Sequence, residues 1–558
     1  MENKEFCKEI VKQLIKEKIT DLDGFIKIRR KLAREVRPNI FPSIIQVLAC
    51  ATEKEFEKLK FLTTKPMRTI AGVAPVAIMT KATKCPHGKC IMCPGGLDSA
   101  YGNTPQSYTG KEPAAMRAFR NKYDSYLQVM NRLEQYTLLN QSTDKVELIL
   151  MGGTFIALDK EYKEDFVKFA FKAMNDFSEM FFIPEFNFGK FKEFFELPAD
   201  VSDKERTKRI QDKMLALKKD CSLEEEQKKN ETSNVRCVAL CVETRPDYCK
   251  KEHIDEMLRL GCTRVEIGVQ SIYDDVLKNI ERGHLVKDSI EATQLLRDSF
   301  LKVGYHIMPG LLGSTKEKDI GMFKKLFSNP DFKPDMLKIY PCMVTKGTKL
   351  YEQWQDKKFV PLTTEDASEI IIKGKKFVDV YCRIMRVQRD IPSKEIIAGV
   401  DITNLRQKIM EVSGVECNCL RCREPKGKMD FSKVEMKRYD YEASNGKEVF
   451  LTIEQDKQLL GFCRLRVPYK PFREEITDNV VGIRQIHVYT TSTKIGENPS
   501  GLQAQHRGFG KQLMKEAERI AKEEFNASKI LVLSGIGVKE YFRKLGYSDV
   551  GVYLEKEL

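Results

Sequence analysis

Lys-Cys-Pro-His-Gly-Lys-Cys-Ile-Met-Cys-Pro-Gly-Gly, residues 84–96, carries three cysteines whose spacing constrains both the chemistry and the fold of this chain. Cys85, Cys90 and Cys93 follow the pattern C-x₄-C-x₂-C. Three thiols so close together cannot all pair as disulfides, and thiolates are ligands of soft metal centres. An iron–sulfur cluster on three cysteines leaves one iron open, whereas a structural zinc site needs a fourth donor. From the cysteines alone, both a cluster and a zinc knuckle remain open.

Length and charge set the next limits. At 558 residues, the chain is too long for one ordinary core, so we expect two or three domains. The net charge of +14 suits a polyanionic partner but does not distinguish RNA, DNA or a phosphate-rich cofactor. No run of about 20 apolar residues predicts a transmembrane helix, and the charged N-terminus does not resemble a secretory signal. The 16 cysteines therefore indicate thiols and metal ligands in a reducing, cytoplasmic location.

Residues 1–70 predict a small helical domain. Apolar residues recur at helical spacing from Phe6 to Ile19. Residues 25–38, FIKIRRKLAREVRP, then gather basic side chains, and residues 1–65 hold 15 Lys and Arg against 10 Asp and Glu. A solvated helix face and a nucleic-acid contact both explain such a run. The candidate nucleic-acid contacts here are Arg29, Arg30 and Arg34.

Residues 71–400 alternate short apolar runs with amphipathic stretches. Near-continuous apolar strands separated by helices predict a parallel sheet covered on both faces, and thus a full or partial β/α barrel. In such a barrel the chemistry lies at the carboxyl ends of the strands. The expected strands are 146–151, 237–242, 265–269, 303–308 and 336–340, and the expected helices include 252–260, 287–299 and 317–327.

Three further segments complete the predicted organisation. Residues 186–234 are rich in Lys, Glu and Asp, which predicts a charged helical insertion or loop on the surface. Residues 401–429 form a linker with its own cysteines, and residues 430–558 change pattern again. Strand-like LTIEQDKQLLGFCRLRVP, IRQIHVYT and ILVLSG surround the helical GFGKQLMKEAERIAKEEF. The C-terminal part is therefore predicted to be a compact α+β domain.

Candidate ligand-binding residues follow several predicted strands. In LILMGGTF, Gly152 and Gly153 follow a predicted strand, where a glycine pair lets a ligand approach the backbone closely. Glu243 stands in CVETRPDY, Gln270 in EIGVQS and His306 in YHIMPGLLGST. Polar groups at strand ends are candidates for ligand recognition. Surface ion pairing for Glu243 and a structural role for His306 are the alternatives.

A second glycine pattern opens a predicted helix near the C-terminus. AQHRGFGKQLM carries Q-x-x-G-x-G at Gln505, Gly508 and Gly510, followed by Lys511. A helix N-terminus binds phosphate through its unbonded N–H groups, and glycines permit close approach. A simple helix cap is the alternative. Tyr541, in the later segment KEYFRKLGY, is either a polar group near this site or part of the core.

The motifs of the predicted barrel together resemble the radical S-adenosylmethionine superfamily. The resemblance implies a 4Fe–4S cluster on Cys85, Cys90 and Cys93 that binds S-adenosylmethionine and yields a 5′-deoxyadenosyl radical on reduction. It places Gly152 and Gly153 beside the methionine amine. Glu243 and Gln270 are the further candidate cofactor contacts.

The C-terminal domain resembles the GNAT acetyltransferase fold, in which the Gln505–Lys511 region would bind the acetyl-CoA pyrophosphate. A radical S-adenosylmethionine barrel fused to a GNAT domain resembles the catalytic subunit of Elongator, over residues 70–558. Supporting segments include CIMCPGGLDS, PQSYTGKEPAAMRA, YCRIMRVQRDIPS and IRQIHVY. The resemblance implies an acyltransferase that forms 5-carboxymethyluridine at the tRNA wobble position, with acetyl-CoA as the source of the two added carbons. In that scheme the radical abstracts hydrogen from the acetyl methyl group, whose carbon then adds to C5 of uridine.

That chemistry requires the uridine to leave its stack, which favours an anticodon loop over duplex RNA. Arg383, Arg386 and Arg389 in YCRIMRVQRD are candidates for guiding backbone phosphates. Tyr541 and His487 are the candidate polar groups near the reacting centre; position 542 is Phe, where related sequences often carry a second Tyr. The cysteine loop is shorter than the eukaryotic C-x₉-C-x₂-C form, which suggests an archaeal or bacterial type acting without other Elongator subunits. An electron donor is also implied.

Cys417, Cys419 and Cys422 offer three ligands for a structural zinc between the two domains. The fourth ligand stays open among Cys382, Cys463, a histidine and water, and free thiols are the alternative. A metal here would lock the barrel to the GNAT domain. Other functions considered are a protein-lysine acetyltransferase with an inert barrel, a radical tRNA methylthiolase and a non-catalytic RNA-binding protein. The intact cysteine motif argues against an inert barrel, and the GNAT motif against a methylthiolase.

Overall fold

The computed structural model describes residues 3–36, 41–62, 72–199, 203–414, 417–425, 433–489 and 508–558. The chain divides into two compact units. The first comprises Met1–Val76, Asp124–Glu147 and Asp165–Val238, and the second comprises Ala77–Tyr123, Leu148–Glu164 and Ala239–Leu558. None of the described helices combines the length and the apolar character needed to cross a bilayer.

The first unit is mainly helical. The apolar residues that predicted the first helix are buried: Phe6, Ile10 and Leu14 are each 0% exposed. The helices are α1 (Asn3–Lys16), α2 (Leu22–Val36), α3 (Ile44–Cys50), α4 (Glu53–Lys58), α6 (Ser125–Leu138), most of α7 (Lys160–Phe181), α8 (Phe188–Phe194), α9 (Lys204–Leu217) and α10 (Leu223–Asn230).

Residues 186–234 are helical, as predicted, but they are not simply a surface insertion. The Phe188 ring stacks on Phe56 of α4 with centroids 3.9 Å apart, and Lys192 donates to the Ala51 carbonyl at 2.8 Å. Phe191 is fully buried between Phe177 and Phe181. The prediction of a surface segment rested on the charged composition and did not take these phenylalanines into account. They recur at helical spacing and pack α8 against the N-terminal helices.

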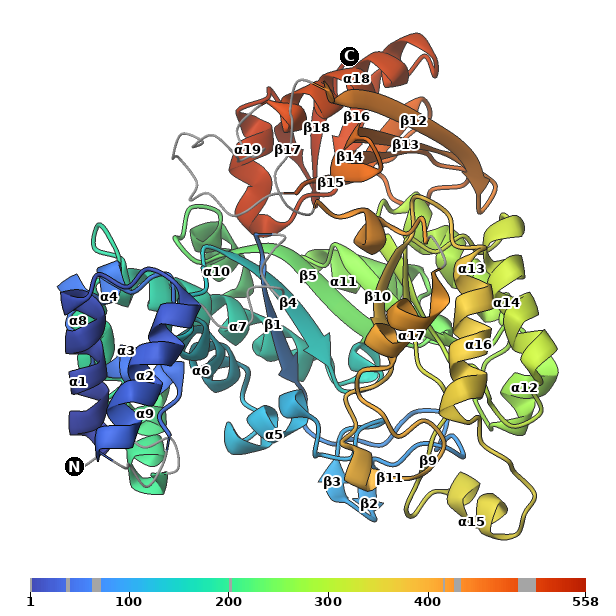
Figure 1. Cartoon of the computed structure of the whole chain (residues 1–558). Helices are drawn as coiled ribbons and strands as arrows, with labels where there is room; N and C mark the ends of the chain where they lie inside the picture. Colours follow the sequence, from blue (N-terminus) through green and yellow to red (C-terminus); the bar gives the residue numbers. More distant parts are fainter. Residues whose placement is uncertain are drawn as a thin grey trace. The chain divides into compact units, whose positions relative to one another are not determined.

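The barrel prediction is confirmed as an open, partial barrel. Its seven strands lie in the order β1-β4-β5-β6-β7-β8-β10, and the pairs β5–β6, β6–β7, β7–β8 and β8–β10 are parallel (Figure 1). Pairing between β10 and β1 is not found in the described residues. The strands are β1 (Ala74–Met79), β4 (Lys145–Met151), β5 (Arg236–Thr244), β6 (Arg264–Gln270), β7 (Lys302–Ile307), β8 (Met336–Ile339) and β10 (Arg383–Val387).

Five of these strands agree with the sequence prediction to within two residues at each end, because long apolar runs mark strands buried on both faces. The sequence pattern missed β1 and β10. In β10 the side chains of Arg383 and Arg386 interrupt the apolar run. The helices that follow the strands are α11 (Lys251–Arg259), α12 (Asp274–Asn279), α13 (Val286–Asp298), α14 (Lys316–Ser328), α16 (Thr364–Lys375) and α17 (Leu405–Ser413).

Short elements follow the carboxyl ends of the strands. The hairpin β2 (Gly96–Ser99) and β3 (Gly102–Thr104) comes after the cysteine loop and is followed by α5 (Pro113–Arg120). After β8 come β9 (Val344–Thr345) and α15 (Lys349–Gln355), and β9 pairs with β11 (Ile396–Ala398). Together with the cysteine loop, these segments line the end of the sheet at which barrel chemistry is expected.

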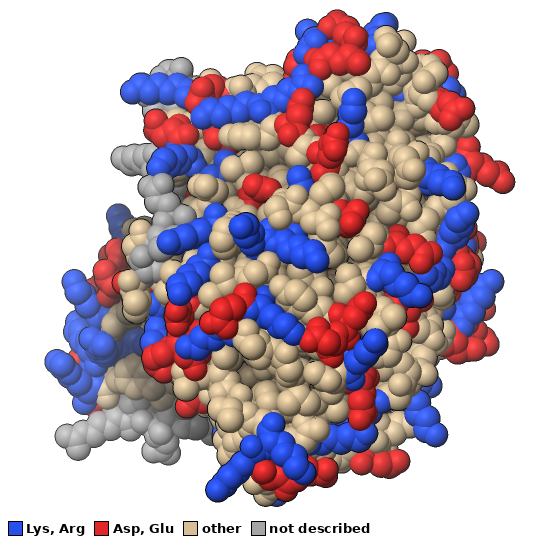
Figure 2. Space-filling view, turned by 90° about the vertical axis from the view of Figure 1, so that its right-hand side faces the viewer, with Lys and Arg blue, Asp and Glu red and all other residues tan. Residues whose placement is uncertain are grey.

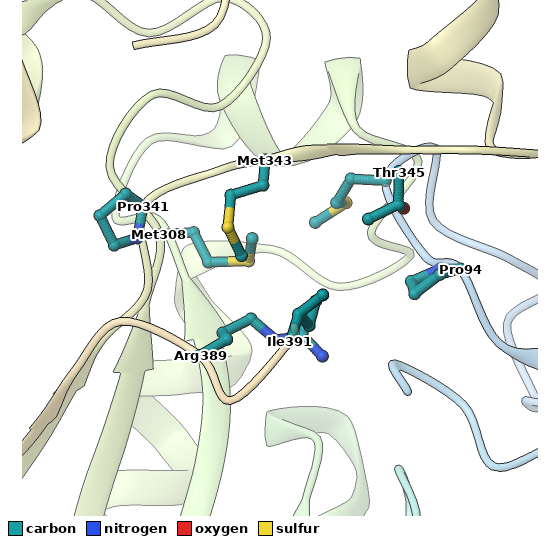
Figure 3. A pocket seen from close by; sticks show the side chains of 8 residues that line it. Pro94, Met308, Pro341, Met343, Thr345, Arg389 and Ile391 are labelled. Atoms are coloured by element: carbon teal, nitrogen blue, oxygen red, sulfur yellow. The ribbon is translucent and has the colours of Figure 1, made fainter. Parts of the chain in front are cut away.

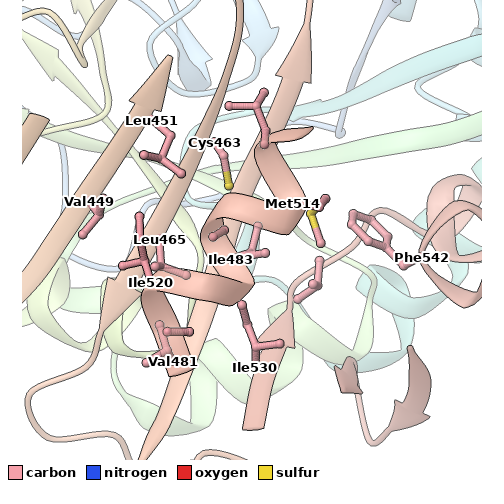
Figure 4. Close-up of a cluster of buried hydrophobic side chains, with 14 of the residues drawn as sticks. Val449, Leu451, Cys463, Leu465, Val481, Ile483, Met514, Ile520, Ile530 and Phe542 are labelled. Carbon is pink, nitrogen blue, oxygen red and sulfur yellow. The ribbon is translucent and has the colours of Figure 1, made fainter. Parts of the chain in front are cut away.

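The C-terminal domain is a second seven-stranded sheet in the order β12-β13-β14-β15-β16-β18-β17. Helix α18 (Phe509–Glu523) covers one face, where its residues Met514 and Ile520 belong to one core with Ile483 and Leu465 of the sheet (Figure 4). This confirms the helix predicted within GFGKQLMKEAERIAKEEF. The other elements are β12 (Glu435–Ala443), β13 (Gly446–Gln455), β14 (Gln458–Val467), β15 (Val480–Val488), β16 (Lys529–Val532), α19 (Lys539–Arg543), β17 (Ser548–Val550) and β18 (Tyr553–Glu557).

A buried network of charges joins the barrel to the C-terminal sheet within the second unit. Glu448 accepts hydrogen bonds from Arg297 at 2.8 Å and from Arg484 at 2.9 Å, and Arg484 also donates to Asp335 at 2.8 Å. Because buried charges are tolerated only when paired, this network fixes the position of the sheet on the barrel. Its members, each at most 1% exposed, are Arg297, Asp298, Asp335, Glu448, Arg464, Arg466 and Arg484.

Candidate functional site

The cysteine loop lies between β1 and β2 and is organised by His87. The His87 ring nitrogens lie 3.0 Å from Cys85 Sγ and 3.2 Å from Cys90 Sγ. Cys93 is held separately: its Sγ accepts the Ser107 N–H at 3.3 Å. Burial, and then nearby Arg245 and Arg282, lower the pKa of His87 to about 3, so its ring is neutral at pH 7.

The surroundings of the loop place hydrogen-bond donors beside two of its sulfur atoms. Arg282 donates to Cys90 Sγ at 3.6 Å, and the Ser107 amide donates to Cys93. Donors and positive charge beside sulfur stabilise the thiolate form that binds metal. Gly88 has φ +93°, a conformation that lets the loop turn between Cys85 and Cys90. Three cysteines with this support fit an iron–sulfur cluster.

The two cysteine motifs differ in the spacing of their sulfur atoms. The Sγ atoms of Cys417, Cys419 and Cys422 all lie within 4.8 Å of one another. A zinc ion with bonds of about 2.3 Å places its tetrahedral sulfur ligands about 3.8 Å apart, so this triad fits a single ion. Among the described residues, Cys85, Cys90 and Cys93 do not form such a tight group. Wider spacing suits a cluster, in which each thiolate binds a different iron.

The predicted glycine pair lies beside the cysteine loop. Gly152 and Gly153 directly follow β4, with φ +136° and +100°. A Cβ on Gly152 would overlap the Thr80 hydroxyl, and one on Gly153 would lie 2.9 Å from Gln106 Cβ. Gln106 in turn accepts the Cys93 thiol at 3.3 Å. The pair therefore has both the conformation and the close packing that only glycine permits.

Glu243 and His306 belong to one polar network inside the partial barrel. Glu243 accepts from the Tyr108 hydroxyl at 3.0 Å and from Lys338 at 3.0 Å. Lys338 also contacts Glu266, which lies 2.9 Å from His306 Nε2 and 3.2 Å from the Arg264 guanidinium. Burial lowers the pKa of Lys338, but Glu266 and Glu243 outweigh it and hold that pKa well above its usual value.

Glu243, Glu266 and His306 have donor atoms within 4.8 Å of one another, which is close enough for a metal. The Lys338 ammonium already contacts both carboxylates and balances their charge. We therefore assign this cluster to a lysine-centred ion network, in which the ammonium occupies the place of a metal ion.

Gln270 ends β6 in a left-handed conformation, φ +65°, which is uncommon for a residue other than glycine. Its side-chain oxygen is buried without a hydrogen-bond partner in the described structure. An unsatisfied buried acceptor on a strained residue at a strand end marks a ligand-facing position. Arg245, two residues after Glu243, forms a two-point ion pair with Asp247 at 2.8 and 2.9 Å.

A small pocket opens beside the cysteine loop (Figure 3). Sulfur-containing side chains and prolines make most of its wall, and Arg389 supplies its charge. Arg389 also donates to the Ser107 carbonyl, which ties the segment after β10 to the segment that holds Cys93. The lining residues are Met92, Pro94, Met308, Pro341, Met343, Thr345, Arg389 and Ile391.

In the C-terminal domain, Gly510 and Tyr541 are brought together. Gly508 caps α18 with φ +83°, and a Cβ on Gly510 would lie 2.7 Å from the Tyr541 hydroxyl. Burial, with a smaller effect of Cys463, raises the pKa of Tyr541 to about 12, so the phenol keeps its proton at pH 7. Lys511 is exposed at the same end of the helix. Gln505 lies outside the described residues.

Strands β15 and β16 diverge beside this site. They pair in parallel only from Val480 to Ile483, although β15 continues to Val488. The side chain of Val488 faces Gly510, with 3.9 Å to the position of its Cβ. On that side the backbone of β15 is not paired with β16, so it can pair with an extended amide-containing ligand.

His487 points to the other face of the same strand, because neighbouring side chains alternate. Its ring stacks on Phe462 at 5.8 Å and meets Tyr489 edge-on at 4.4 Å. Tyr489 accepts from Arg383 of the barrel at 3.0 Å. The structure therefore does not bring His487 and Tyr541 together: His487 faces the barrel, and Tyr541 faces α18.

The Cys417–Cys422 segment lies between barrel and sheet. Leu420 N–H donates to the Cys382 carbonyl at 2.9 Å, Arg421 donates to the Met385 carbonyl at 2.9 Å, and Arg423 bonds Glu454 of β13 at 2.7 Å. A metal on the triad would therefore sit at the junction of the two domains. Cys382 packs near Cys419, but a fourth donor is not found within 4.8 Å in the described residues.

The candidate RNA-binding arginines differ in their availability. Arg30 and Arg34 are exposed on α2, whereas Arg29 is half-buried and donates to the Pro42 carbonyl at 3.1 Å. Arg386 is 46% exposed and pairs with Asp390. Arg383 forms an ion pair with Glu424 and donates to the Tyr489 hydroxyl, so its charge is balanced within the protein.

Sequence reasoning missed Tyr108, Lys338 and His87 as parts of the site. Tyr108 stands in PQSYTGKEP, and Lys338 stands in the apolar strand MLKIY. Lys338 could have been recognised from the sequence, because it stands in an otherwise apolar strand. A charge buried on such a strand needs an acidic partner. His87 could also have been recognised, because it stands between Cys85 and Cys90, two cysteines of the ligand motif.

Comparison with known families covers most of the chain. A Radical SAM superfamily model matches residues 79–326, and a Radical SAM C-terminal domain model matches 334–412. An ELP3 N-terminal domain model matches residues 3–70, and an acetyltransferase (GNAT) family model matches 418–547.

Individual relatives extend over nearly the full length. The tRNA uridine(34) acetyltransferase of Methanocaldococcus infernus is 48% identical over 567 residues, covering 98% of both chains. Elongator complex protein 3 of Homo sapiens is 38% identical over 570 residues, covering 99% of this chain and 96% of the human one. The solved structure of archaeal Methanocaldococcus infernus Elp3 with an N-terminal deletion matches with TM-score 0.70 and 44% identity, over 87% of this chain and 99% of that one.

Proposed function

The chain belongs to the Elongator complex protein 3 family, and we propose that it modifies uridine 34 of tRNA, forming 5-carboxymethyluridine from acetyl-CoA with S-adenosylmethionine as radical source. The observation that carries the proposal is the presence of two differently built sites in one compact unit. One is the cysteine loop beside Gly152 and Gly153, and the other is Gly510 beneath Tyr541.

Cys85, Cys90 and Cys93 would hold a 4Fe–4S cluster, which when bound supplies the electron for reductive cleavage of S-adenosylmethionine. The Ser107 amide and Arg282 would donate hydrogen bonds to two of the ligating sulfurs when the cluster is bound. Glycines at 152 and 153 leave the backbone open to the methionine part of the cofactor. The side-chain oxygen of Gln270 has no partner in the described structure, so it could accept a hydrogen bond from a donor group of S-adenosylmethionine.

The second site would bind acetyl-CoA. Gly508 and Gly510 let the pyrophosphate approach the N–H groups at the start of α18, and Lys511 adds positive charge. The pantetheine arm would pair with β15 where β16 leaves it. When water attacks the thioester carbonyl, Tyr541, which keeps its proton at pH 7, would donate that proton to the departing CoA thiolate.

The tRNA would bind through its anticodon loop, whose unpaired uridine can enter the barrel. Exposed Arg30 and Arg34 supply contacts for backbone phosphate, and Arg386 and Arg389 supply charge near the barrel end. Arg383 and His487 would hold the barrel and the C-terminal domain in a fixed relative position rather than contact the substrate.

A zinc ion on Cys417, Cys419 and Cys422 would strengthen the same junction. The cysteine loop has the short C-x₄-C-x₂-C form, so we infer that the chain is of the archaeal or bacterial type and acts without further Elongator subunits, with an external electron donor. Cytoplasmic thiol chemistry agrees with the cysteines: all 16 lie in the described residues, and none is joined in a disulfide.

The test is mass spectrometry of nucleosides from tRNA incubated anaerobically with reconstituted protein, dithionite, S-adenosylmethionine and carbon-13-labelled acetyl-CoA. We expect labelled 5-carboxymethyluridine. Cys90→Ala should abolish it while tRNA affinity is kept, and Gly508→Glu should abolish it by blocking the pyrophosphate site. Label transferred to lysine side chains of a protein, with none on tRNA, would support the alternative protein-lysine acetyltransferase and contradict the proposal.

A further inference from the structure

Helix α5, the eight residues Pro113–Arg120, turns an apolar face to solvent. Phe119 is 74% exposed and Met116 is 48% exposed. The opposite face is buried, where Ala115 and Ala118 pack on Met79 at the end of β1. A phenylalanine left this exposed, one helical turn from an exposed methionine, is unusual unless it meets a partner.

The segments around α5 are strongly basic. Residues 80–123, which run from just after β1 through the cysteine loop to three residues beyond α5, contain seven Lys and Arg against two acidic residues, Asp98 and Glu112. Glu112 is only 4% exposed, and its carboxylate accepts the Thr109 N–H at 3.0 Å. The exposed cations include Lys81, Lys84, Lys89, Lys111, Arg120 and Lys122.

The surface over α12, α14 and α16 of the same unit does not share this imbalance. Over α12, α14 and α16, Lys and Arg are interspersed with Asp and Glu (Figure 2). Ion pairs join them there: Lys318 lies 2.6 Å from Asp275, and Lys373 lies 2.6 Å from Glu369. The cations around α5 are therefore a local feature of the second unit rather than the average surface of a basic protein.

The position of α5 connects this surface to the site. Arg117 donates to the Ala77 carbonyl of β1 at 3.0 Å, and α5 lies beyond the carboxyl ends of β1 and β4 (Figure 1). The segment that leads into α5 also holds Cys93 through Ser107. A strand of RNA lying across α5 would therefore run along the end of the barrel through which a base must enter.

We propose that the exposed face of α5 is a docking surface for single-stranded RNA, on which Phe119 stacks an unpaired base of the tRNA anticodon loop. Lys111 and Lys122 contact the flanking phosphates. An aromatic side chain surrounded by cations, with little acidic charge, is the arrangement that binds single strands by stacking and charge. The inference rests on the proposed function, since it takes tRNA as the partner, and it names the loop nucleotides next to the target uridine as the ligand.

The test measures the affinity of the full chain for fluorescently labelled tRNA by anisotropy. Loss of one base–aromatic stack should weaken binding by roughly five- to one-hundred-fold in Phe119→Ala, whereas Phe119→Tyr should stay within about two-fold. The matched control is Tyr469→Ala, because Tyr469 is 58% exposed and only its backbone N–H bonds Asp298. That variant should bind tRNA like the wild type.

Two further measurements define the class of ligand. Lys111→Gln/Lys122→Gln should reduce the slope of log affinity against log salt by about 0.7 for each lost phosphate contact, while Lys324→Gln on α14 should not change it. A fully paired RNA duplex should bind the wild type and Phe119→Ala equally, because stacking needs an unpaired base.

Equal tRNA affinity of the wild type and Phe119→Ala would overturn the inference and leave the proposed function standing. Failure of the wild type to bind tRNA at all would overturn the proposed function itself. Sedimentation analysis adds a third outcome: if Phe119→Ala turns a dimer into a monomer and leaves tRNA affinity unchanged, the face is a contact with a second copy of the chain, and the RNA assignment is wrong.

Discussion

Glu448→Gln removes the central acid of the network between the barrel and the C-terminal sheet. Glu448 accepts from Arg297 at 2.8 Å, Arg466 at 3.0 Å and Arg484 at 2.9 Å, and it is 1% exposed. Burial raises the pKa of this carboxyl, but the three guanidinium groups outweigh it, so the pKa lies below its usual value and the group is charged. The network contains four arginines and three acidic residues, and the substitution reduces the acidic residues to two.

The expected cost follows from this burial. Removing one partner of a buried ion pair costs about 3–5 kcal/mol, because the remaining charges cannot regain water. At roughly 2–4 °C per kcal/mol, the melting temperature should fall by roughly 6–20 °C. The control Glu516→Gln breaks an exposed pair with Arg519 on α18, worth at most about 1 kcal/mol, and should shift melting by only a few degrees.

Dye-monitored thermal unfolding of both variants measures the difference. Glu448→Gln/Arg297→Met restores the original charge difference, so it should recover part of the loss instead of adding to it. Equal melting shifts for Glu448→Gln and Glu516→Gln would refute the reasoning, because they would mean that the network is as well hydrated as a surface pair.

Three other predictions concern local features. Gly510→Ala places a methyl group 2.7 Å from the Tyr541 hydroxyl, so acetyl-CoA affinity by calorimetry should fall while S-adenosylmethionine binding is kept; equal loss of both ligands would contradict separate sites. Burial raises the pKa of Asp319 to about 6, so its carboxyl favours the protonated form when folded, and stability should fall by about 3 kcal/mol as pH rises from about 4 to 6. Urea unfolding should show that fall in the wild type but not in Asp319→Asn. Cys419→Ser should lose about one zinc per chain by elemental analysis and loosen the domain junction to proteolysis; unchanged metal content would refute the zinc site.

Much of the fold could be predicted because its signals are local. Apolar runs such as VELILM and CVALCV mark strands buried on both faces, and the cysteine spacing marks a metal centre without knowledge of the fold. Gly510 and Tyr541 were each singled out from short motifs, and the structure places them in contact.

The rest depends on tertiary contacts that local patterns do not contain. Arg484 in IRQIHVY has the composition of a half-exposed strand, yet it is fully buried against Asp335 of the barrel. Arg383 was expected to guide phosphates, but it pairs with Glu424, which lies far away in sequence. Phe119 would ordinarily be assigned to the core, and only the structure shows it on the surface.

The account depends most on both sites acting on the same acetyl group. The direct test incubates the protein and tRNA with S-adenosylmethionine and acetyl-CoA deuterated in its methyl group, and measures deuterium in the released 5′-deoxyadenosine by mass spectrometry. We predict deuterated 5′-deoxyadenosine that depends on tRNA and disappears in Gly508→Glu. Release of unlabelled 5′-deoxyadenosine alongside formation of the modified uridine would contradict the account, because the radical would then act on a different hydrogen.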